Sequence, residues 1–283
     1  MPAVAIVTCA ELPELDPDEA ALLAPLRELG LTATPEVWTD SAVDWEKFDL
    51  TVLRCPWDYA EQRDRFITWA KSVPRLHNSA ALVEWNTDKR YLADLAAAGV
   101  PVVPTTWLPP GGEVSLPARG EWVLKPSVGA GSRNAGRYQM ATQATEAAEH
   151  VARLHRSDIT VMAQPYMSDV DVNGERALVY IDGRFSHAIR KGAMLDGPYR
   201  GLDDLYKAEN ITPLTVGDAD RELAEAALAA VPTDQPLLYA RVDLVESEVG
   251  SVVLEVEVAE PSLFFGHDPE AAARLAKAIA RRI

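Results

Sequence analysis

Two carboxylates stand one residue apart in VLEVEVAEP, residues 253–261. Successive side chains of a β-strand leave opposite faces. Glu255 and Glu257 are therefore expected to share one face, while Leu254 and the two valines after it share the other. Like charges so close together repel each other unless water or a cation screens them. A solvated sheet face is the simplest explanation. The residues of the neighbouring strand indicate whether a bound cation explains the two acids better.

The strand that precedes these two acids carries further charged side chains. The stretch LLYARVDLV is joined to SVVLEVEVA by a short segment containing a glycine, which predicts a β-hairpin. If the turn centres on Val249, Asp243 lies opposite Glu255 and Arg241 lies opposite Glu257. All four side chains then occupy one face, which favours a functional site over a solvated surface.

Three carboxylates with no histidine or cysteine nearby suit a hard cation that prefers oxygen ligands, such as Mg²⁺. Such an ion usually keeps some of its waters and shares phosphate oxygens, and its charge would offset the repulsion between the acids. Arg241 would be a fixed positive charge beside it. We therefore look for phosphate-binding groups elsewhere in the chain.

A candidate phosphate site follows the strand-like segment EWVLKP. Lys125 ends this strand, and a loop with Gly129, Gly131 and Gly136 comes directly after it at residues 127–136. Such a loop can place backbone N–H groups against phosphates, with the lysine as a point charge. A simple hairpin turn would have the same appearance. The chain contains no GxxxxGK[ST], and GAGSRNAG is not the GxGxxG of a dinucleotide site.

A candidate substrate site lies in LRCPWDYAEQ, which follows an N-terminal strand. In open α/β sheets ligands bind beyond the carboxyl ends of the strands. Arg54 could bind a substrate carboxylate with both guanidinium nitrogens, and Trp57, Asp58 and Tyr59 would shape the wall. A packed aromatic loop with Arg54 in a surface ion pair explains the same residues.

The elements that must position these groups alternate along the chain, and the fold class is α/β. Apolar runs at 4–9 and 49–55 predict buried parallel strands with a helix between them, and 60–72 reads as a second helix. Further along the chain we expect helices over 86–101, 141–155 and 218–231, strands over 121–126 and 160–167, a hairpin turning at Asp182-Gly183, the paired strands above and a last helix after Asp268. We expect three domains, 1–85, 86–165 and 166–283.

The amino-acid composition limits the classes of binding partner that we expect. The chain has 27 basic and 43 acidic residues, a net charge of −16. Nucleic acids and anionic membranes are bound mainly by excess positive charge, so neither is an expected partner. Cys9 and Cys55 form no metal-ligand spacing, and no signal peptide or apolar span is visible. We expect a cytoplasmic protein and leave open whether it is a homo-oligomer.

The order of the motifs resembles the ATP-grasp fold, particularly its glutathione synthetase-like and D-alanine–D-alanine ligase-like members. The motifs are TDKRYLADLAAAGVPVVPT, VLKPSVGAGS, MAQPYM, GERALVYIDGRFSHAIRK and ARVDLV…VLEVEVAEPS, over about residues 86–266. The resemblance implies an N-terminal open α/β domain, a central α+β lid domain with a glycine-rich loop and a C-terminal catalytic domain.

The resemblance also implies roles for individual residues. Arg241 would stabilise the oxyanion of the reaction, and Asp243, Glu255 and Glu257 would bind Mg²⁺ or Mn²⁺. The family usually has Asn at the third metal position; Glu257 adds one negative charge, which favours two ions. Residues implied to bind ATP are Lys89, Lys125, Ser127, Gly129, Gly131, Ser132, Gln164, Pro165, Tyr166, Met167 and Glu175. Residues implied to bind an amino-acid-like carboxylate substrate are Arg54, Trp57, Asp58, Arg176, Lys191, Arg241, Glu260 and Ser262.

RCPWDY together with EVEVAEPSLFF resembles a small ATP-grasp group that closes O-ureido-serine into the ring of D-cycloserine. The implied chemistry is phosphorylation of a carboxylate by ATP and attack of a nitrogen from the same molecule on the acyl phosphate. A lid would exclude water, and the loops at 127–136 and 195–201 are candidates for it. A ligase joining two separate molecules and a nucleotide-binding module without activity remain alternatives. We assign no role to His187 or His267.

Overall fold

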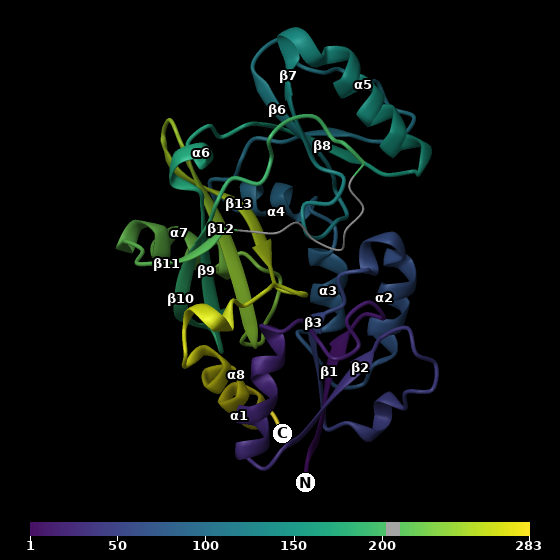
Figure 1. Cartoon of the computed structure of the whole chain (residues 1–283), viewed down its shortest axis with the longest axis vertical. Helices are drawn as coiled ribbons and strands as arrows, with labels where there is room; N and C mark the ends of the chain where they lie inside the picture. The colour runs from purple at the N-terminus through teal and green to yellow at the C-terminus, as the bar shows by residue number, and fades with distance from the viewer. Residues whose placement is uncertain (202–209) are drawn as a thin grey trace.

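Three β-sheets organise the chain, whose computed structural model describes residues 1–201 and 210–283 (Figure 1). The first sheet is parallel and the other two are antiparallel, so the predicted α/β class with an α+β lid is confirmed. The N-terminal sheet has the strand order β2-β1-β3-β4. Its strands are β1 (Ala3–Thr8), β2 (Thr32–Val37), β3 (Leu50–Cys55) and β4 (Leu76–His77).

The connections of the N-terminal sheet partly follow the predictions. Strands β1 and β3 and helix α2 (Arg63–Ser72) lie where expected. The segment between β1 and β3 differs, because a 3₁₀ turn (Glu19–Leu22) and a short helix α1 (Leu23–Glu28) leave room for the unforeseen strand β2. Two further 3₁₀ turns cover Trp45–Lys47 and Tyr59–Glu61.

The helix expected over 86–101 is shorter and is preceded by another. The chain forms α3 (Ala80–Asn86) and α4 (Tyr91–Ala97) with a turn between them. In that turn the Lys89 N–H donates to the carbonyl of Ser127 instead of continuing a helix. The break therefore fixes Lys89 against the glycine-rich loop.

The middle sheet, at the top of Figure 1, has the order β5-β8-β6-β7 and carries one long helix on a face. The helix and strand β6 match their predicted ranges closely. The elements are β5 (Thr106–Leu108), β6 (Glu121–Pro126), β7 (Gly136–Gln139), α5 (Met140–Arg156) and β8 (Val161–Pro165).

The C-terminal sheet has the order β11-β10-β9-β12-β13. Its first hairpin turns at Asp182 and Gly183, as predicted; both have positive φ, as tight hairpin turns require. The elements are α6 (Val170–Asn173), β9 (Glu175–Ile181), β10 (Arg184–Lys191), β11 (Ile211–Leu214), α7 (Asp218–Ala229), β12 (Tyr239–Ser247), β13 (Gly250–Glu257), a 3₁₀ turn (Phe265–His267) and α8 (Ala271–Ala280).

Two of the sheets share a hydrophobic core. One continuous cluster joins Ile6 and Leu26 of the N-terminal unit to Val179 and Tyr239 of the C-terminal sheet and to Leu275 of α8. In Figure 1 the last helix accordingly lies beside α1. The middle sheet has a separate core under α5. The N- and C-terminal sheets therefore form one packed body, and the middle sheet is the more independent part.

A buried ion pair reinforces the shared body. The Arg54 guanidinium donates from Nε and Nη2 to the two carboxylate oxygens of Glu19, at 2.7 and 3.0 Å. It also donates to the carbonyl of Pro261. Both side chains of the pair are essentially inaccessible to solvent. Arg54 thus links β3 to the 3₁₀ turn and to the segment that follows β13.

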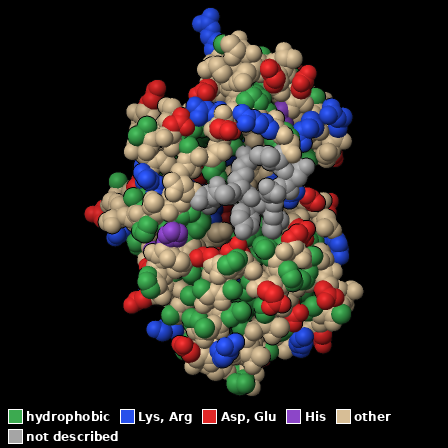
Figure 2. Space-filling model, in the orientation of Figure 1, with side chains coloured by type: hydrophobic (Ala, Val, Ile, Leu, Met, Phe, Trp, Pro, Cys, Tyr) green, Lys and Arg blue, Asp and Glu red, His purple; other side chains and the backbone are tan. Residues whose placement is uncertain are grey.

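The surface and the helices agree with the composition. Figure 2 shows acidic and basic side chains interspersed over one face of the molecule. The described part of this face therefore offers no continuous basic surface for a nucleic-acid backbone. None of the helices in the described residues has both the length and the apolar character that crossing a lipid bilayer requires.

Replacement of Arg54 tests the buried link. We expect Arg54→Met to lower the free energy of unfolding by about 3–5 kcal/mol, because it leaves the Glu19 carboxylate buried without its cation. Urea denaturation measures the change. The control is Lys71→Met in the half-exposed pair Lys71–Glu84, which should cost at most about 1 kcal/mol. Equal losses in the two variants would contradict a structural role for the buried pair.

Candidate active site

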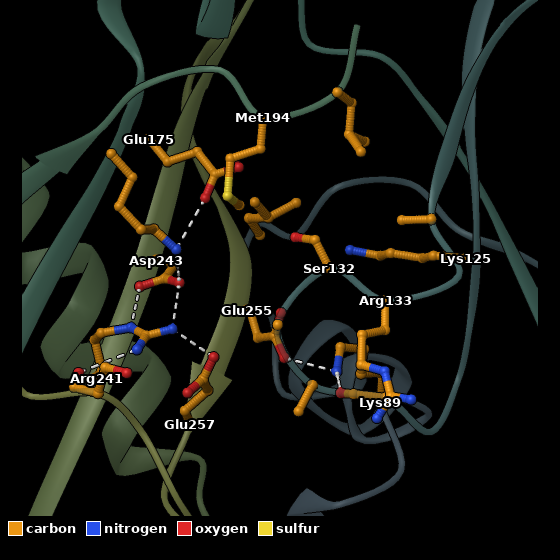
Figure 3. A pocket seen from close by; sticks show the side chains of 18 of the residues that line it. Lys89, Lys125, Ser132, Arg133, Glu175, Met194, Arg241, Asp243, Glu255 and Glu257 are labelled. Atoms are coloured by element: carbon orange, nitrogen blue, oxygen red, sulfur yellow. Dashed lines mark hydrogen bonds and ion pairs between the residues drawn. The ribbon is translucent and has the colours of Figure 1, made fainter. Parts of the chain in front are cut away.

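The hairpin of β12 and β13 pairs as predicted at the acidic face. Arg241 lies opposite Glu257 and Asp243 lies opposite Glu255. The arginine and the three acids line the same cavity, and Figure 3 shows them facing one another. The predicted register is therefore confirmed where it matters for chemistry.

The hairpin also contains an irregularity in its pairing that the sequence did not predict. The turn centres between Glu248 and Val249, and Leu244 pairs with Val253 while Asp243 pairs with Glu255. Leu254 is thus the extra residue of a β-bulge. Its side chain lines the cavity beside Glu255 instead of pointing with Val256 into the core behind the sheet. The expected alternation was wrong at Leu254, because a bulge lets two consecutive residues face the same side.

Three cations neutralise the acidic face. Arg241 binds Asp243 with both Nε (2.8 Å) and Nη2 (3.0 Å) and also contacts Glu257. Lys191 Nζ lies 2.6 Å from Asp243 Oδ2 and 3.0 Å from Glu175 Oε2. These ion pairs connect four adjacent strands of the C-terminal sheet, β10, β9, β12 and β13, and Figure 3 draws them as dashed lines.

The third cation comes from the turn before α4. Lys89 Nζ lies 2.9 Å from Glu255 Oε1 and donates to the carbonyl of Gly129 at 2.7 Å. It therefore joins the acidic face to the glycine-rich loop of the middle sheet.

The electrostatics of the acids differ sharply. Burial opposes the ionisation of Asp243, but Arg241 and Lys191 outweigh it and lower its pKa to about 2. Burial raises the pKa of Glu257 to about 8, with Arg241 acting against it and Glu255 and Asp243 adding to it. A further positive ion would favour the charged form of Glu257 and lower its pKa, so binding of an ion there is linked to release of a proton.

The donor set fits a hard divalent cation in its chemistry. Carboxylate oxygens from two paired strands line one cavity, and no cysteine or histidine is among the described residues that line it. Across residues 1–201 and 210–283 the carboxylates do not already form a closed cluster of metal ligands. Asp243, whose two oxygens are engaged by Arg241 and Lys191, is the most constrained of the three acids.

The cavity, of about 310 Å³, lies where the three sheets meet. One part is apolar and suits a flat ring, because Val103, Val123, Met167, Val245 and Leu254 contribute to it. The segment Gln164–Met167, whose residues were expected to bind ATP, also lines the cavity. The cavity therefore offers an apolar region and a charged region side by side.

Lys125 projects into this cavity from the end of β6, as Figure 3 shows. Burial lowers its pKa. Within the described residues it makes no hydrogen bond or ion pair, in contrast to Lys89 and Lys191. An anionic group that enters the cavity would therefore pair with Lys125 without displacing another partner of this lysine.

The glycine-rich loop covers the same cavity. Gly129, Gly131 and Ser132 line it, and the last two have positive φ, a conformation that glycine adopts without steric cost. Arg133 of this loop also lines the cavity and forms an ion pair with Glu61 of the N-terminal unit. The loop thus reaches across the opening, as a lid would.

Several residues expected at the site line the cavity, and five do not; one of these, Tyr59, packs instead in a hydrophobic cluster of the N-terminal unit. The remaining lining residues from the expected set are Trp57, Glu175, Lys191, Glu260 and Ser262. Arg54 was expected to meet a substrate carboxylate, and this was wrong because its guanidinium is buried against Glu19 and Pro261. Asp58 instead accepts a hydrogen bond from the Trp38 indole at 2.7 Å.

The other two corrections also follow from local geometry. Arg176 follows Glu175 on β9, so its side chain leaves the opposite face, where it pairs with Asp220 and Glu246. Ser127 is buried behind the loop, and its backbone bonds Lys89 and Thr160.

The structure also adds residues that the sequence reading did not assign to the site. Asp16, Asp18 and Glu19 line the cavity, although the acidic stretch DPDE was interpreted only as the start of a helix. Its three acids in four residues were the available signal. Arg133, Met194 and Phe264 are further additions.

Comparison with known proteins bears on this site. The N-terminal residues 4–78 match the family model described as "D-cycloserine synthetase DcsG, N-terminal domain". Over 99% of its length the chain is 41% identical to "Cycloserine biosynthesis protein DcsG" of Streptomyces lavendulae, of which it covers 98%. The crystal structure of D-cycloserine synthetase DcsG superposes with a TM-score of 0.89 at 39% identity, over 99% of both chains.

More distant structures share the fold. D-alanine–D-alanine ligase from Bacillus anthracis, solved with ATP, has a TM-score of 0.67 at 15% identity over 100% of this chain and 97% of the ligase. The ATP-grasp ligase PsnB, solved with a variant of its minimal precursor, Mg and ADP, has a TM-score of 0.61 at 16% identity over 100% of this chain and 99% of PsnB.

The three sheets and the charged cavity between them are thus those of an ATP-grasp ligase, an enzyme that binds ATP and a small substrate. The resemblance inferred from the five motifs is confirmed. Within this class, the chain belongs to the D-cycloserine synthetase DcsG family.

Arg241 gives the most direct test of the site. We expect Arg241→Met to retain ATP binding and to turn over about 10²–10³-fold more slowly, because it removes a positive charge where an oxyanion would form. Steady-state ADP release and nucleotide titration separate the two effects. Arg190→Met, exposed on β10, is the control. Near-normal turnover of Arg241→Met would show that this arginine only neutralises Asp243 and Glu257.

Proposed function

We propose that this enzyme phosphorylates the carboxylate of an amino-acid-derived substrate with ATP and closes the acyl phosphate with a nitrogen of the same molecule. The product is D-cycloserine and the substrate is O-ureido-D-serine. The observation that carries this proposal is the full-length similarity to DcsG together with Arg241, Asp243, Glu255 and Glu257 on one face of the cavity. A nucleotide-binding module without activity would have no need of an arginine at that position.

The roles of the residues follow from their placement. Lys125 and Lys89 hold phosphate oxygens of ATP, with the backbone of the glycine-rich loop, and the apolar region with Gln164–Met167 holds the base. The substrate carboxylate lies between these phosphates and Arg241. The guanidinium there is already fixed by Asp243 and by the carbonyl of Ser262 at 3.1 Å, so it needs no reorganisation when negative charge develops.

The metal residues in this proposal are Asp243, Glu255 and Glu257. Bound Mg²⁺ or Mn²⁺ supplies neutralisation of phosphate charge. Glu257, once it has lost its proton, would supply the extra acceptor that a second ion needs. Binding requires Glu255 to share its oxygens with Lys89, and Glu257 to share its oxygens with Arg241.

The atoms balance with one water molecule. Transfer of the γ-phosphoryl group to the carboxylate gives the acyl phosphate and ADP. The nitrogen bonded to the side-chain oxygen attacks the acyl carbon and loses its proton, and phosphate leaves with the electrons of the C–O bond. In O-ureido-serine this nitrogen carries a carbamoyl group. Water cleaves that group as carbamic acid, which decomposes to ammonia and carbon dioxide.

The tether between the two reacting groups favours ring closure. Attack within one molecule gains the effective concentration of a tethered nucleophile. A ligase joining two molecules would need a second pocket for the amine.

Removal of metal tests the acidic face. We expect ADP formation to stop with EDTA and to return with Mg²⁺ or Mn²⁺. Glu255→Ala should abolish nearly all activity, whereas Glu257→Asn, which gives the residue more usual in the fold, should keep part of it. Glu248→Ala in the exposed turn of the same hairpin is the control. Full activity in metal-free buffer would refute the assignment.

Supplying one substrate at a time tests ring closure. We expect O-ureido-D-serine, ATP and Mg²⁺ to suffice for ADP, phosphate and a cyclic product, which mass spectrometry identifies. The alternative predicts ADP only when a second amine is added, with a product that contains both molecules. That result would replace the cyclising function with intermolecular ligation.

A further inference from the structure

Glu260 has an environment unlike that of the other acids at the cavity. It lies three residues beyond Glu257, lines the cavity, and is only 8% exposed. The Tyr59 hydroxyl donates a hydrogen bond to its carboxylate. Among residues 1–201 and 210–283 it forms no ion pair with a lysine or arginine. A buried carboxylate with a single neutral donor is costly unless a cation reaches it.

The cations near Glu260 are already engaged. Lys89 is the lysine whose charge influences Glu260 most, but its Nζ is bonded to Glu255 and to the carbonyl of Gly129. Arg241 likewise binds Asp243 and Glu257. The missing positive charge is therefore best supplied by a ligand in the cavity.

The backbone around Glu260 is fixed from both sides. The Trp57 indole donates to the carbonyl of Glu260 at 3.0 Å, and Arg54 donates to the next carbonyl, that of Pro261. Glu19 accepts the N–H of Leu263 at 3.0 Å. These bonds fix the backbone that carries Glu260, and the Tyr59 hydroxyl orients its carboxylate, so the side chain forms a preorganised acceptor.

The position of Arg241 indicates which kind of cation would bind to Glu260. Arg241 donates to the carbonyl of Ser262, two residues beyond Glu260, so the guanidinium and the free carboxylate lie on one wall of the cavity. An α-amino acid carries its ammonium group two bonds from its carboxylate carbon. A substrate whose carboxylate reacts beside Arg241 would thus bring its ammonium group next to Glu260.

We propose that Glu260, oriented by Tyr59, binds the α-ammonium group of the substrate and selects α-amino acids over simple carboxylic acids. This inference rests on the proposed function for an amino-acid substrate. It assigns the same segment two tasks, since Ser262 supports the reacting end through Arg241 and Glu260 holds the amino end. Tyr59, which touches no substrate, is a positioning residue.

The test compares two ligands in the full-length enzyme. One is O-ureido-D-serine and the other is 3-(ureidooxy)propanoate, which lacks only the amino group. Titration calorimetry with ADP and Mg²⁺ present measures both affinities without turnover. We expect the wild type to prefer the amino acid at least about thirtyfold, the lower limit for a buried charge pair that loses one partner.

Two variants and a control separate recognition from folding. Glu260→Gln should bind the two ligands within about threefold of each other, and Tyr59→Phe should keep only part of the preference, because the carboxylate stays but loses its orienting bond. Glu248→Gln should behave as wild type. All three should bind ADP normally, which reports an intact site. If Glu260→Gln fails to bind ADP, Tyr59→Phe decides the matter by itself.

The outcomes distinguish this inference from the function. Preferential binding of O-ureido-D-serine that depends on Glu260, with no cyclic product formed, would refute the proposed reaction and support the inference. Weak binding of both ligands by the wild type, or an unchanged preference in Glu260→Gln and Tyr59→Phe, would overturn the inference whatever the reaction proves to be.

Discussion

The ion pair between Arg241 and Asp243 is the interaction on which the site depends. Both side chains lie on one face of β12, and their two hydrogen bonds orient the guanidinium toward Glu257 and Ser262. Lys191 secures the other side of Asp243 from β10. The guanidinium of Arg241 is thus held rigid before any substrate binds, and preorganised charge of this kind is what makes electrostatic stabilisation effective.

Much of this arrangement could be predicted from the sequence, because it lies on regular elements. The alternation of side chains and the short turn were enough to place Arg241 opposite Glu257. Arg54 shows where such reasoning stops. Its position near the end of a strand suggested a ligand, whereas its true partner, Glu19, is 35 residues away in a stretch whose pattern indicated only the start of a helix. Contacts between irregular segments depend on the whole tertiary structure, and local patterns do not encode them.

The distribution of the cores gives the site both rigidity and access. The metal face, Glu260 and the segments that anchor it belong to the body formed by the N- and C-terminal sheets. Lys125 and the glycine-rich loop belong to the middle sheet, whose core is separate. The ion pair Arg133–Glu61 and the hydrogen bond from Lys89 to Gly129 join the two parts. Opening for substrate entry can break these bonds while leaving the acidic face intact.

The bulge at Leu254 determines where the β12–β13 hairpin can gain or lose residues without disturbing the site. The pairing that aligns the acids is set on the site's side of the bulge, so residues can be inserted at Glu248 and Val249 without moving Arg241 relative to Glu257. Deletion of Leu254 is different, because it removes the bulge. Residues of β13 on one side of it would then have to change either their partners on β12 or the sheet face on which their side chains lie. The tip of this hairpin is therefore the natural place for length variation among descendants of this enzyme, or for fusing a reporter peptide.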